Sequence, residues 1–558
     1  MRDIKKYAFI IFIIISILIF SNVAFGDWYY NWSDRQDING KEAGVFDTTP
    51  FPIDENTNSY SIENDEGVKT FNLGIKYFVD GYNGNDANSG LSIESPKKSI
   101  RAALAAAGNG NKTIIIRGSY GAFDGRYQNE GFSITGNSGE SNTNRFMIVG
   151  YKQERPIIYG GNSIVFNDNG VNNFTLQRIK IQDATGRAIR SSQSDSYFLI
   201  DVWFFNNCSQ CYVGGSDVGD GNVHFFGSPT NAVKNTWIYH CTSEHTYMKC
   251  YKIADNADNM LIEWSIANEC GYWEGIQQTP YAHAYAYDVA AGSTAENNEN
   301  AIIRYNIGGQ ALFGSECRYC PNFDIHHNEF YDSVKEDNYS NEDSSYSQIA
   351  NFAIRGFSSY GKFHSNVVRD NDDTEKPYLF AIVAQDQAVE KIYVYNNIFY
   401  GNIESSQPII LYGYSGDGIS RNILFSNNTI YGSSNQELLR ATQTDADDSV
   451  IIKNNLFFQE GSGSSVAFDT EVNHSYNLYY NPNGSIGTTL DNTDILSNSV
   501  LISIPSTDFE NGEANLSFPI PGDNLNSIYN TDFNGKIRTK WDIGAKEYFT
   551  APKDFKLK

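Results

Sequence analysis

The sequence has little positive charge and no basic cluster. Its 558 residues include 41 Lys and Arg against 66 Asp and Glu, which gives a formal net charge of −25. A nucleic-acid partner is excluded on this ground, because no basic patch offsets the acidic field that repels phosphate groups. An anionic polymer would likewise need a cation or a local basic patch in order to bind.

Long hydrophobic runs are absent except at the start of the chain. Residues 1–26 place three basic residues ahead of an apolar run and small residues after it, which is typical of a secretory signal peptide. An uncleaved membrane anchor is the alternative. We expect a monomeric protein that is secreted, periplasmic or at the cell surface, with no membrane contact once the signal is removed.

Cysteine is also scarce. The seven cysteines lie between residues 208 and 320 and include two C-x-x-C pairs. In an exported chain such pairs favour structural disulfides, with metal binding as the alternative, and the odd count leaves at least one thiol unpaired.

Helical periodicity is missing after the signal except in "SIRAALAAAG", residues 99–108, while one short phrase recurs through the chain. Each copy consists of an apolar residue, two variable residues, a residue at a fixed position that we call the phase residue, one more variable residue and a final apolar residue. The clearest copies have asparagine at the phase position: Asn328, Asn366, Asn397, Asn428 and Asn455, with weaker copies at Asn306 and Asn477. Upstream copies at 176–181, 200–205, 233–238 and 261–266 keep the pattern with other phase residues.

This repeat predicts a parallel β-solenoid. Each phrase marks one bend of a coil, and asparagines repeated at the bend can hydrogen-bond along the stack as a ladder. A Greek-key sandwich would show hairpin turns at strand spacing and would not keep one phase through so many copies. A helical solenoid is excluded because no helical period persists.

Two segments point to a known family. Residues 76–123 hold a strand, a Gly/Asn/Asp turn, a Pro-led short helix and a strand ending in G-x-Y, and residues 534–548 end in "DIGAKEY". The chain therefore resembles secreted right-handed parallel β-helix proteins of the pectate-lyase-like superfamily. The resemblance implies an all-β, right-handed parallel β-helix over residues 76–548 with a short N-terminal capping helix. That superfamily includes polysaccharide lyases, hydrolases, uronate epimerases and non-catalytic surface proteins, so the fold selects no activity.

The chain on either side of this region is short. Residues 27–75 are aromatic at their start and are interpreted as an N-terminal extension that wraps or caps the solenoid, with a small binding module as the alternative. Residues 549–558 form a C-terminal tail.

Aligning the phrases predicts which strands share a lateral sheet. Segments 221–228, 245–253, 281–289, 311–319 and 349–357 lie about halfway between successive bends, so we expect them side by side at about 4.8 Å. Solenoids usually act through side chains on one lateral sheet bordered by long loops. The longest segments between phrases lie in this part of the chain, which makes this sheet the candidate functional face.

Strand alternation then assigns side chains to the two faces of that sheet. In "TPYAHAYAYDVA" rings alternate with alanines, which predicts the rings outward and the alanines inward. In "HTYMKCYKI" the same alternation puts Lys249 outward and Cys250 inward. The expected sugar-stacking residues are His224, Tyr247, Tyr251, Tyr281, Tyr285 and Tyr287.

Cations beside these rings favour β-elimination on a uronate-containing polysaccharide. That reaction needs a base at C5, a cation for the carboxylate and an acid for the leaving oxygen, and the enzymes that the chain resembles use Lys or Arg as base. We expect Lys249 to be the base, because neighbouring cations and aromatic packing can lower a lysine's pKa. Arg318 or Arg355 would bind the carboxylate, while His283 or Tyr285 would protonate the leaving group.

Calcium is the expected cofactor, since the resembled enzymes often use Ca²⁺ for the substrate carboxylate. In "GGSDVGDGN" the oxygens of Asp217, Asp220 and Asn222 lie on a glycine-rich loop beside His224, and such oxygens are the ligands that Ca²⁺ prefers. A plain Asx-rich turn is the alternative, because the spacing is not that of an EF-hand.

Other functions are compatible with the same scaffold. A glycoside hydrolase needs two facing carboxyl groups, and the region offers Glu244, Glu263, Glu269, Glu274, Asp288, Glu316 and Asp324. A uronate C5-epimerase would use the same base and cations, and a non-catalytic carbohydrate-binding or adhesion β-helix would need neither. The Lys-then-Arg-His-Gly spacing of alginate-lyase-like enzymes is absent after Lys249, so alginate gains no support.

Overall fold

The computed structural model divides the chain into two units, Met1–Glu42 and Ala43–Lys558, and the residues described here all lie in the second unit. They are residues 43–46, 49–118, 127, 131–134, 136–161, 165–209, 221–271, 285–291, 298–309, 311, 314–331, 350–356, 358–370, 378–384, 389–401, 409–413, 420–433, 435–442, 450–469, 472–497, 522–526, 528–533, 537–538 and 543–545. The predicted signal peptide, residues 1–26, and the tail, residues 549–558, lie outside them.

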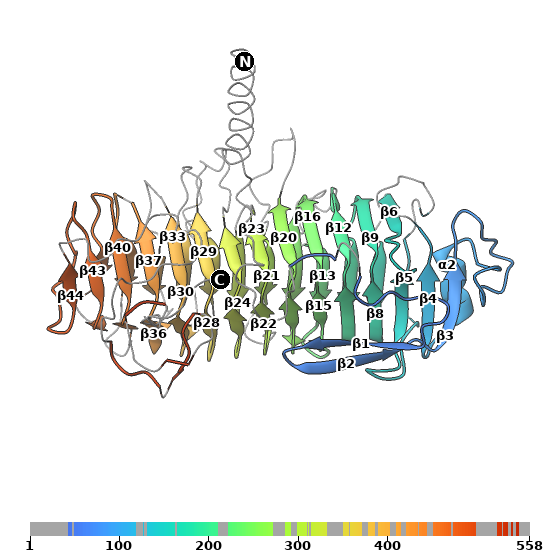
Figure 1. Cartoon of the computed structure of the whole chain (residues 1–558), viewed down its shortest axis with the longest axis horizontal. Coiled ribbons are helices and arrows are strands. Elements are labelled where there is room, and N and C mark those ends of the chain that lie inside the picture. The colour runs from blue at the N-terminus through green and yellow to red at the C-terminus, as the bar shows by residue number, and fades with distance from the viewer. Residues whose placement is uncertain are drawn as a thin grey trace, which may run out of the picture. The chain divides into compact units, whose positions relative to one another are not determined.

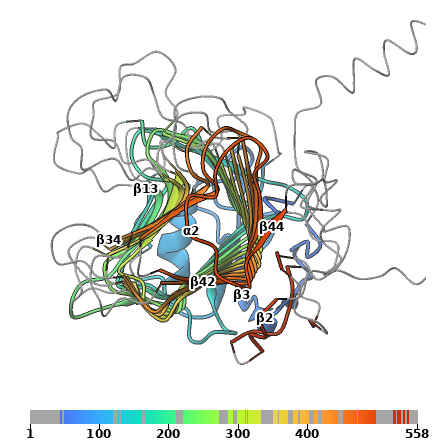
Figure 2. The ribbon, with the colours of Figure 1, turned by 90° about the vertical axis from the view of Figure 1, so that its left-hand side faces the viewer.

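Three parallel sheets run along the second unit (Figure 1), and over most of the chain successive long strands fall in the three sheets in turn. Figure 2 looks along the solenoid and shows the sheets as the three sides of the coil. The structure is therefore the right-handed parallel β-helix that the sequence predicted.

The strands of the three sheets have the following bounds. Sheet 1 consists of β7 (Phe166–Asn169), β10 (Ile189–Ser192), β13 (Gly221–Phe226), β17 (Lys249–Ala254), β21 (Tyr287–Ala290), β24 (Gly314–Arg318), β27 (Ala350–Arg355), β30 (Tyr378–Ala384), β34 (Ile409–Gly413), β38 (Leu439–Thr442) and β41 (Val466–Phe468). Sheet 2 consists of β3 (Ile75–Val79), β4 (Lys112–Ile116), β5 (Phe146–Gly150), β8 (Asn172–Gln177), β11 (Asp195–Ile200), β15 (Trp237–Tyr239), β19 (Leu261–Glu263), β22 (Ile302–Arg304), β25 (Asp324–His326), β28 (Lys362–His364), β32 (Tyr393–Tyr395), β36 (Ile423–Ser426), β39 (Val450–Lys453) and β42 (Asn473–Ser475), with β14 (Val233–Lys234) and β18 (Ala257–Asp258) beside them. Sheet 3 consists of β6 (Ile157–Gly161), β9 (Lys180–Ala184), β12 (Trp203–Phe205), β16 (Thr242–Thr246), β20 (Ile266–Cys270), β23 (Ile307–Gly309), β26 (Glu329–Tyr331), β29 (Val367–Asp370), β33 (Ile398–Gly401), β37 (Thr429–Gly432), β40 (Leu456–Gln459), β43 (Leu478–Tyr480) and β44 (Ile495–Ser497). A short pair, β31 (Val389–Glu390) and β35 (Ser420–Arg421), lies apart from them.

The core fills the inside of the coil with inward side chains that stack from one turn to the next. Phe330, Phe352, Phe363 and Phe380 form one such stack, with successive ring centroids 4.7–5.0 Å apart. Because every coil repeats this packing, the outward residues of a sheet are free to differ between coils without disturbing the core.

The asparagine ladder predicted from the phase positions is confirmed. Asn306 begins it, and each side-chain amide donates to the side-chain oxygen of the next asparagine at 3.0–3.2 Å as far as Asn477. These asparagines are fully buried between sheets 2 and 3, so the ladder satisfies polar groups that would otherwise be desolvated without partners.

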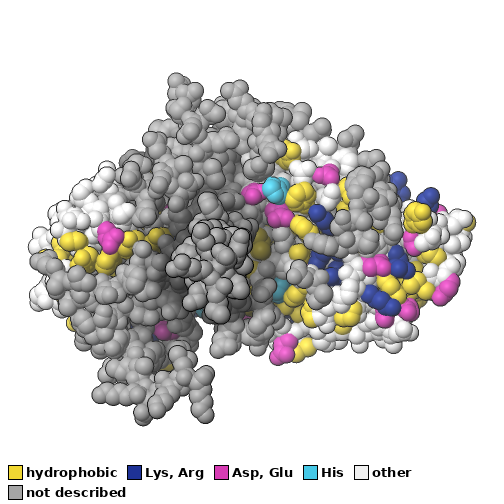
Figure 3. Space-filling view, turned by 45° about the horizontal axis from the view of Figure 1, so that its top comes forward, with side chains coloured by type: hydrophobic (Ala, Val, Ile, Leu, Met, Phe, Trp, Pro, Cys, Tyr) yellow, Lys and Arg dark blue, Asp and Glu magenta, His cyan; other side chains and the backbone are white. Residues whose placement is uncertain are grey.

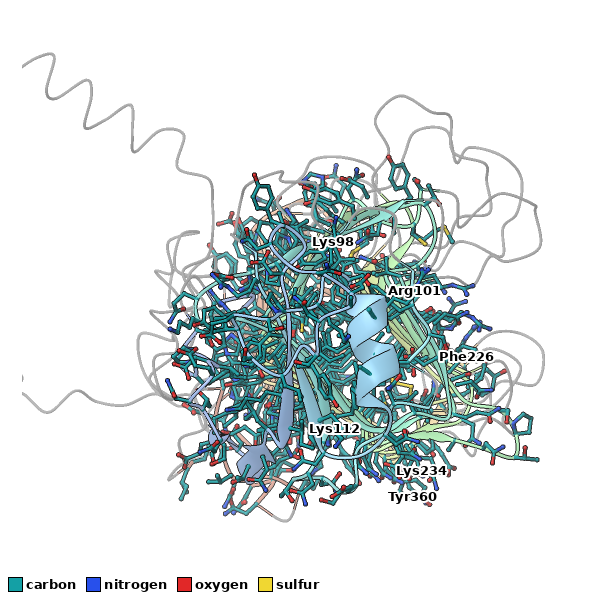
Figure 4. The ribbon with its side chains drawn as sticks, turned by 90° about the vertical axis from the view of Figure 1, so that its right-hand side faces the viewer. Lys98, Arg101, Lys112, Phe226, Lys234 and Tyr360 are labelled. Carbon is teal, nitrogen blue, oxygen red and sulfur yellow. A yellow bond between two sulfur atoms is a disulfide. The ribbon has the colours of Figure 1, made fainter. Side chains whose placement is uncertain are left out.

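The predicted capping helix is present as α2, Ile100–Ala107. Ser99 caps its N-terminus by accepting a hydrogen bond from the Ala102 N–H at 3.1 Å, as serine commonly does at this position. Ile100 and Leu104 face the core. Figure 4 looks from the N-terminal end and shows α2 lying across the opening of the coil, where it covers apolar side chains of the first turn.

The chain before the solenoid forms an antiparallel hairpin of β1 (Ser59–Asn64) and β2 (Gly67–Asn72). Figure 1 shows it lying lengthwise across several coils. Ile62 and Phe71 are buried in an apolar cluster with Phe198 and Trp237 on the outer side of sheet 2. This segment therefore covers the N-terminal half of sheet 2.

The C-terminal segment packs on other coils of the same sheet. The Tyr529 ring stacks on Tyr395 with centroids 4.0 Å apart, and Lys453 pairs with Asp523 at 2.9 Å. Gly544 has a φ of +95° and donates its N–H to the Asn454 carbonyl at 2.8 Å, a left-handed conformation that favours glycine. The glycine of the "DIGA" motif is thus required by the backbone.

The cysteines form structural bridges, as predicted. Cys250 is bonded to Cys270 and Cys317 to Cys320, and Cys208 is also disulfide-bonded. Cys241 is a buried free thiol. Within the described residues no helix has the length and apolarity needed to cross a bilayer.

Candidate functional site

The five strands predicted to share a lateral sheet are neighbours in sheet 1, in the order β13, β17, β21, β24, β27. Their register places His224, Lys252, Asp288 and Glu316 in one transverse row, each opposite the next. A second row brings Arg318 opposite Arg355. The outer face of this sheet therefore gathers ionisable side chains from residues far apart in the sequence.

Two of the predicted sugar-stacking tyrosines point the other way. Tyr251 and Tyr287 lie in the core of the solenoid with their rings stacked at 5.5 Å, and the Tyr287 hydroxyl donates to backbone carbonyls of Ser265 and Ile307. The alternation assumed from sequence breaks where β21 begins, since Ala286 and Tyr287 are both buried in the core. The prediction that these tyrosines contact sugar is therefore wrong.

A glycine makes room for this inward ring. A Cβ at Gly308 would lie 3.0 Å from the Tyr287 ring, which is closer than ordinary packing allows. Gly308 is the sequence signal that could have indicated this inward ring, while its neighbour Gly309 makes room for the Tyr331 ring instead.

Lys249 lies at the start of β17, opposite Gly221. Its ammonium is buried and donates a hydrogen bond to the Asp288 carboxyl group, and it lies 5.2 Å from the centroid of the Tyr285 ring. Tyr285 is buried beside the same cluster, and burial together with Glu316 raises the pKa of its phenol. Tyr285 therefore stays protonated near neutral pH.

Asp288 and Glu316 form a pair of carboxyl groups on adjacent strands. Both are almost fully buried. Burial alone would raise the pKa of Glu316, but Arg318 and Arg355 outweigh it and lower the pKa to about 2. Arg355 Nη1 lies 3.1 Å from Glu316 Oε2, and Arg318 Nε lies 4.0 Å from Oε1.

The pKa of Asp288 is shifted in the opposite direction, upward. Burial raises its pKa, Lys249 opposes that effect, and the negative charge of Glu316 raises the pKa further. A hydrogen bond between the two carboxyl groups also lowers the pKa of Glu316. In this pair Glu316 is the ionised member and Asp288 the one that holds a proton more readily.

The pKa of Lys252, which sequence reasoning did not select, is shifted strongly. Burial and the nearby Lys249 lower the pKa of this lysine to about 8. Opposite it, burial and the cations Lys252 and Arg187 hold the pKa of His224 well below its usual value. His224 is therefore neutral near pH 7.

The remaining predicted residues are less informative. Tyr247 is half-buried and donates its backbone N–H to the Asn207 carbonyl, while Tyr281, His283, Asp217 and Asp220 lie outside the described residues. Asn222 is not on a loop: it lies in β13, fully buried, with its amide donating to Ser243 Oγ at 3.0 Å. This corrects its assignment as a calcium ligand.

No metal centre is apparent in the part of the chain that the structure describes, where no group of three or more His, Cys, Asp or Glu side chains could hold an ion. Calcium binding by the segment that contains Asp217 and Asp220 stays a prediction. The chemistry of the described face rests on the carboxyl pair and the cations around it.

Comparison with known proteins gives a likeness of fold. No family model matches the sequence, and no curated protein matches it. Solved structures that match include XylC in complex with xylose (10% identity, TM-score 0.43, covering 85% of this chain and 98% of that one) and pectate lyase Pel9A (13% identity, TM-score 0.39, 86% and 97%). The surface adhesin PfbA of Streptococcus pneumoniae also matches (13% identity, TM-score 0.40, 71% and 96%). Likeness of this degree assigns no activity.

Proposed function

We propose that this chain is an exported glycoside hydrolase in which Asp288 and Glu316 are the catalytic carboxyl groups. The observation that carries the proposal is the pair itself: two carboxyl groups lie opposite each other on adjacent strands, one held ionised and the other held toward its protonated form. Environments that drive two neighbouring pKa values apart are how one site supplies both an acid and a nucleophile.

The close spacing of the pair favours retention of anomeric configuration. Adjacent strands lie about 4.8 Å apart, which matches the separation of about 5 Å between the carboxyl groups of retaining glycosidases and not the wider gap of inverting ones. The hydrogen bond between Asp288 and Glu316 would break when the sugar enters between them. In the first step Asp288 would give its proton to the glycosidic oxygen while Glu316 attacks the anomeric carbon. In the second step water would replace Glu316 on that carbon and return a proton to Asp288.

The charges around the pair favour an acidic sugar. Lys249, Lys252, Arg318 and Arg355 surround two carboxyl groups in a protein whose net charge is −25. Such a local excess of cations attracts an anionic group that the rest of the surface repels. We therefore propose an extracellular polysaccharide that contains uronate as the substrate.

The test is product analysis on a panel of uronate-containing polysaccharides. Hydrolysis releases new reducing ends without an unsaturated uronate. The Glu316→Gln and Asp288→Asn variants should each lose at least about a hundredfold in rate, while Glu94→Gln, which changes an exposed carboxylate on the surface, should match the wild type. Full activity in both site variants would overturn the proposal.

A polysaccharide lyase is the second candidate, and the lowered pKa of Lys252 is the observation that favours it. Lys252 rather than Lys249 would be the base, because Lys249 is ion-paired with Asp288 whereas the pKa of Lys252 is about 8. The same digests distinguish the two functions. A rise in the ultraviolet absorbance of unsaturated uronate that is lost in Lys252→Ala would identify a lyase.

A further inference from the structure

The outer side of sheet 3 carries a second cluster of functional side chains, on β9, β12, β16 and β20. Trp203 and Phe205 of β12 are half-buried. The register places Lys180 opposite Trp203, and it places Phe205 opposite Glu244. We call this surface the Trp203 face, and define it by Lys180, Trp203, Phe205, Glu244, His245 and Glu269.

The two rings are held in a fixed orientation. The Trp203 indole N–H donates to Glu244 Oε1 at 2.7 Å, and the rings of Trp203 and Phe205 lie at 78° to each other with centroids 6.3 Å apart. The Lys180 ammonium lies 4.0 Å from the Trp203 centroid and 4.5 Å from that of Phe205. The Glu244 carboxylate and the Lys180 ammonium therefore hold the two rings in place.

A row of polar groups borders the rings. Asp183, Asn206, His245 and Glu269 follow one another on successive coils, and all four have a left-handed backbone, with φ between 49° and 55°. This conformation is unfavourable for residues other than glycine, though least so for Asp and Asn, and bends on other coils of the solenoid adopt it as well. His245 Nδ1 lies 2.5 Å from Glu269 Oε2, and Asn206 donates to Asp183 at 2.7 Å.

We propose that the Trp203 face binds a neutral glycan, separately from the carboxyl pair of sheet 1. Aromatic rings offer apolar surface to the C–H face of a sugar, and convergent polar groups beside them fix its hydroxyls. Here the carboxyl groups of Glu244, Glu269 and Asp183 can accept hydrogen bonds from sugar hydroxyls, and the Lys180 ammonium can donate them.

The charge of the face selects between glycan classes. The face carries the carboxyl groups of Glu244, Asp183 and Glu269, and the first two act on the Lys180 ammonium together with Arg155. A uronate would meet more negative than positive charge on the face itself, whereas the sheet 1 cluster holds four cations around two carboxyl groups. The two faces therefore suit different sugars, one neutral and one acidic. Figure 3 shows Lys and Arg, Asp and Glu, His and apolar side chains gathered together on the N-terminal half of the solenoid, to the right of the view.

Affinity electrophoresis of the full-length protein in native gels tests this proposal. The gels contain a soluble β-glucan, a xylan, a galactomannan or polygalacturonate. The Glu316→Gln variant serves as the parent so that cleavage of the polymer does not interfere. We expect retardation in at least one neutral gel, weakened about tenfold by either Trp203→Ala or Phe205→Ala.

The control is Tyr360→Ala, which removes an aromatic side chain that is 54% exposed elsewhere on the solenoid and should leave retardation unchanged. If the ring variants fail to fold, Lys180→Gln takes their place, and it should weaken retardation while keeping both rings. No retardation by any neutral polymer, or retardation that these variants leave intact, would overturn the proposal. Because the carboxyl pair is already disabled in the parent, neither result bears on the hydrolase proposal.

Discussion

At the scale of single residues, the ionisation of Glu316 depends on two guanidinium groups. Arg318 and Arg355 are the principal effects that lower its pKa against the opposing effect of burial. A carboxylate with a pKa of about 2 stays ionised at neutral and mildly acidic pH and is therefore available as a nucleophile there. Removing one arginine should raise that pKa, because a buried carboxyl group loses a charge that favours its ionised form.

We therefore predict that Arg355→Met makes activity sensitive to acid. The wild type should keep its rate down to about pH 5, whereas the variant should lose rate progressively as pH falls, because Glu316 becomes protonated. Initial rates between pH 4 and 8 on the preferred polymer check this, with Arg101→Met on the exposed side of α2 as control. A variant whose profile matches the wild type would contradict the role given to Arg355.

The alkaline side of the same pH–rate profile depends on the protonation of Asp288. Its pKa is raised by burial, and a general acid must be protonated to act. We predict that the rate falls as pH rises through this pKa, and that Lys249→Met moves the fall to higher pH because it removes the positive charge that opposes protonation. A shift of the alkaline limb to lower pH in Lys249→Met would contradict this assignment.

At the scale of strands and turns, the asparagine ladder is the feature that the sequence predicted best. Its phase residues recur in a fixed phrase, and a bend that is repeated on every coil imposes the same hydrogen bonds each time. The neighbouring strands of sheet 1 followed from the same alignment. A repeat that depends on local geometry can be recognised in a single sequence, because the same residue pattern occurs in every copy.

Side-chain direction was predicted less well. The alternation rule failed at Tyr287, where the chain enters β21 and an inward ring fills the space left by Gly308. Polar residues flanked by inward ones, such as Asp288 between Tyr287 and Val289 and Glu316 between Ser315 and Cys317, mark the outer face correctly. The carboxyl pair and Lys252 could not be ranked above other candidates, because burial and charge environment set their pKa values and neither is visible in sequence.

We predict that Asn397→Ala destabilises the solenoid strongly. Asn397 donates to the Phe363 carbonyl and to Asn428, and its oxygen accepts hydrogen bonds from the backbone and side chain of Asn366. Losing these bonds in a fully buried site should lower the free energy of unfolding by about 3 kcal/mol. Chemical denaturation measures this, and the exposed Asn492→Ala should change it by less than about 0.5 kcal/mol.

A histidine cluster on sheet 2 should make stability sensitive to acid. His326 Nδ1 lies 2.8 Å from His327 Nδ1, and the His326 ring stacks on His364 at 4.9 Å. Burial and these two histidines, with Arg304 and Lys362, hold the pKa of His326 well below its usual value. The folded state disfavours protonation of His326. The contribution of the neutral His326 to stability is therefore complete above about pH 6.5 and is lost as the pH falls.

We predict that the melting temperature declines between about pH 6.5 and pH 5 and that His326→Gln makes this decline shallower. His474→Gln, which alters an imidazole paired with Asp494 at 2.7 Å, provides a matched histidine control. An unchanged slope in His326→Gln would show that the cluster does not control acid stability.

At the scale of the whole molecule, charge is distributed unevenly. The chain carries a net charge of −25, yet sheet 1 collects four cations around its carboxyl pair. The described parts of residues 43–72 and 522–545 pack across the solenoid, against sheet 2 and its border with sheet 3. These two described segments therefore lie away from the cations of sheet 1.

This arrangement predicts that binding of an acidic polymer weakens with salt. Raising ionic strength shortens the screening length from about 10 Å at 0.1 M, so KM on a uronate polymer should rise with added NaCl while kcat changes little. Binding of a neutral polymer by the Trp203 face should not respond. A KM that is independent of salt would contradict an electrostatic role for the sheet 1 cations.

The central claim is that Glu316 is the nucleophile and Asp288 the acid and base, and chemical rescue by azide tests it most directly. Azide can replace the missing carboxylate in Glu316→Ala and attack the anomeric carbon itself, which gives a glycosyl azide of inverted configuration. In Asp288→Ala, azide should instead intercept the glycosyl-enzyme and give a product of retained configuration. These two products, identified by NMR, are the predicted result. Rescue of neither variant, or hydrolysis at the wild-type rate in both, would contradict the account.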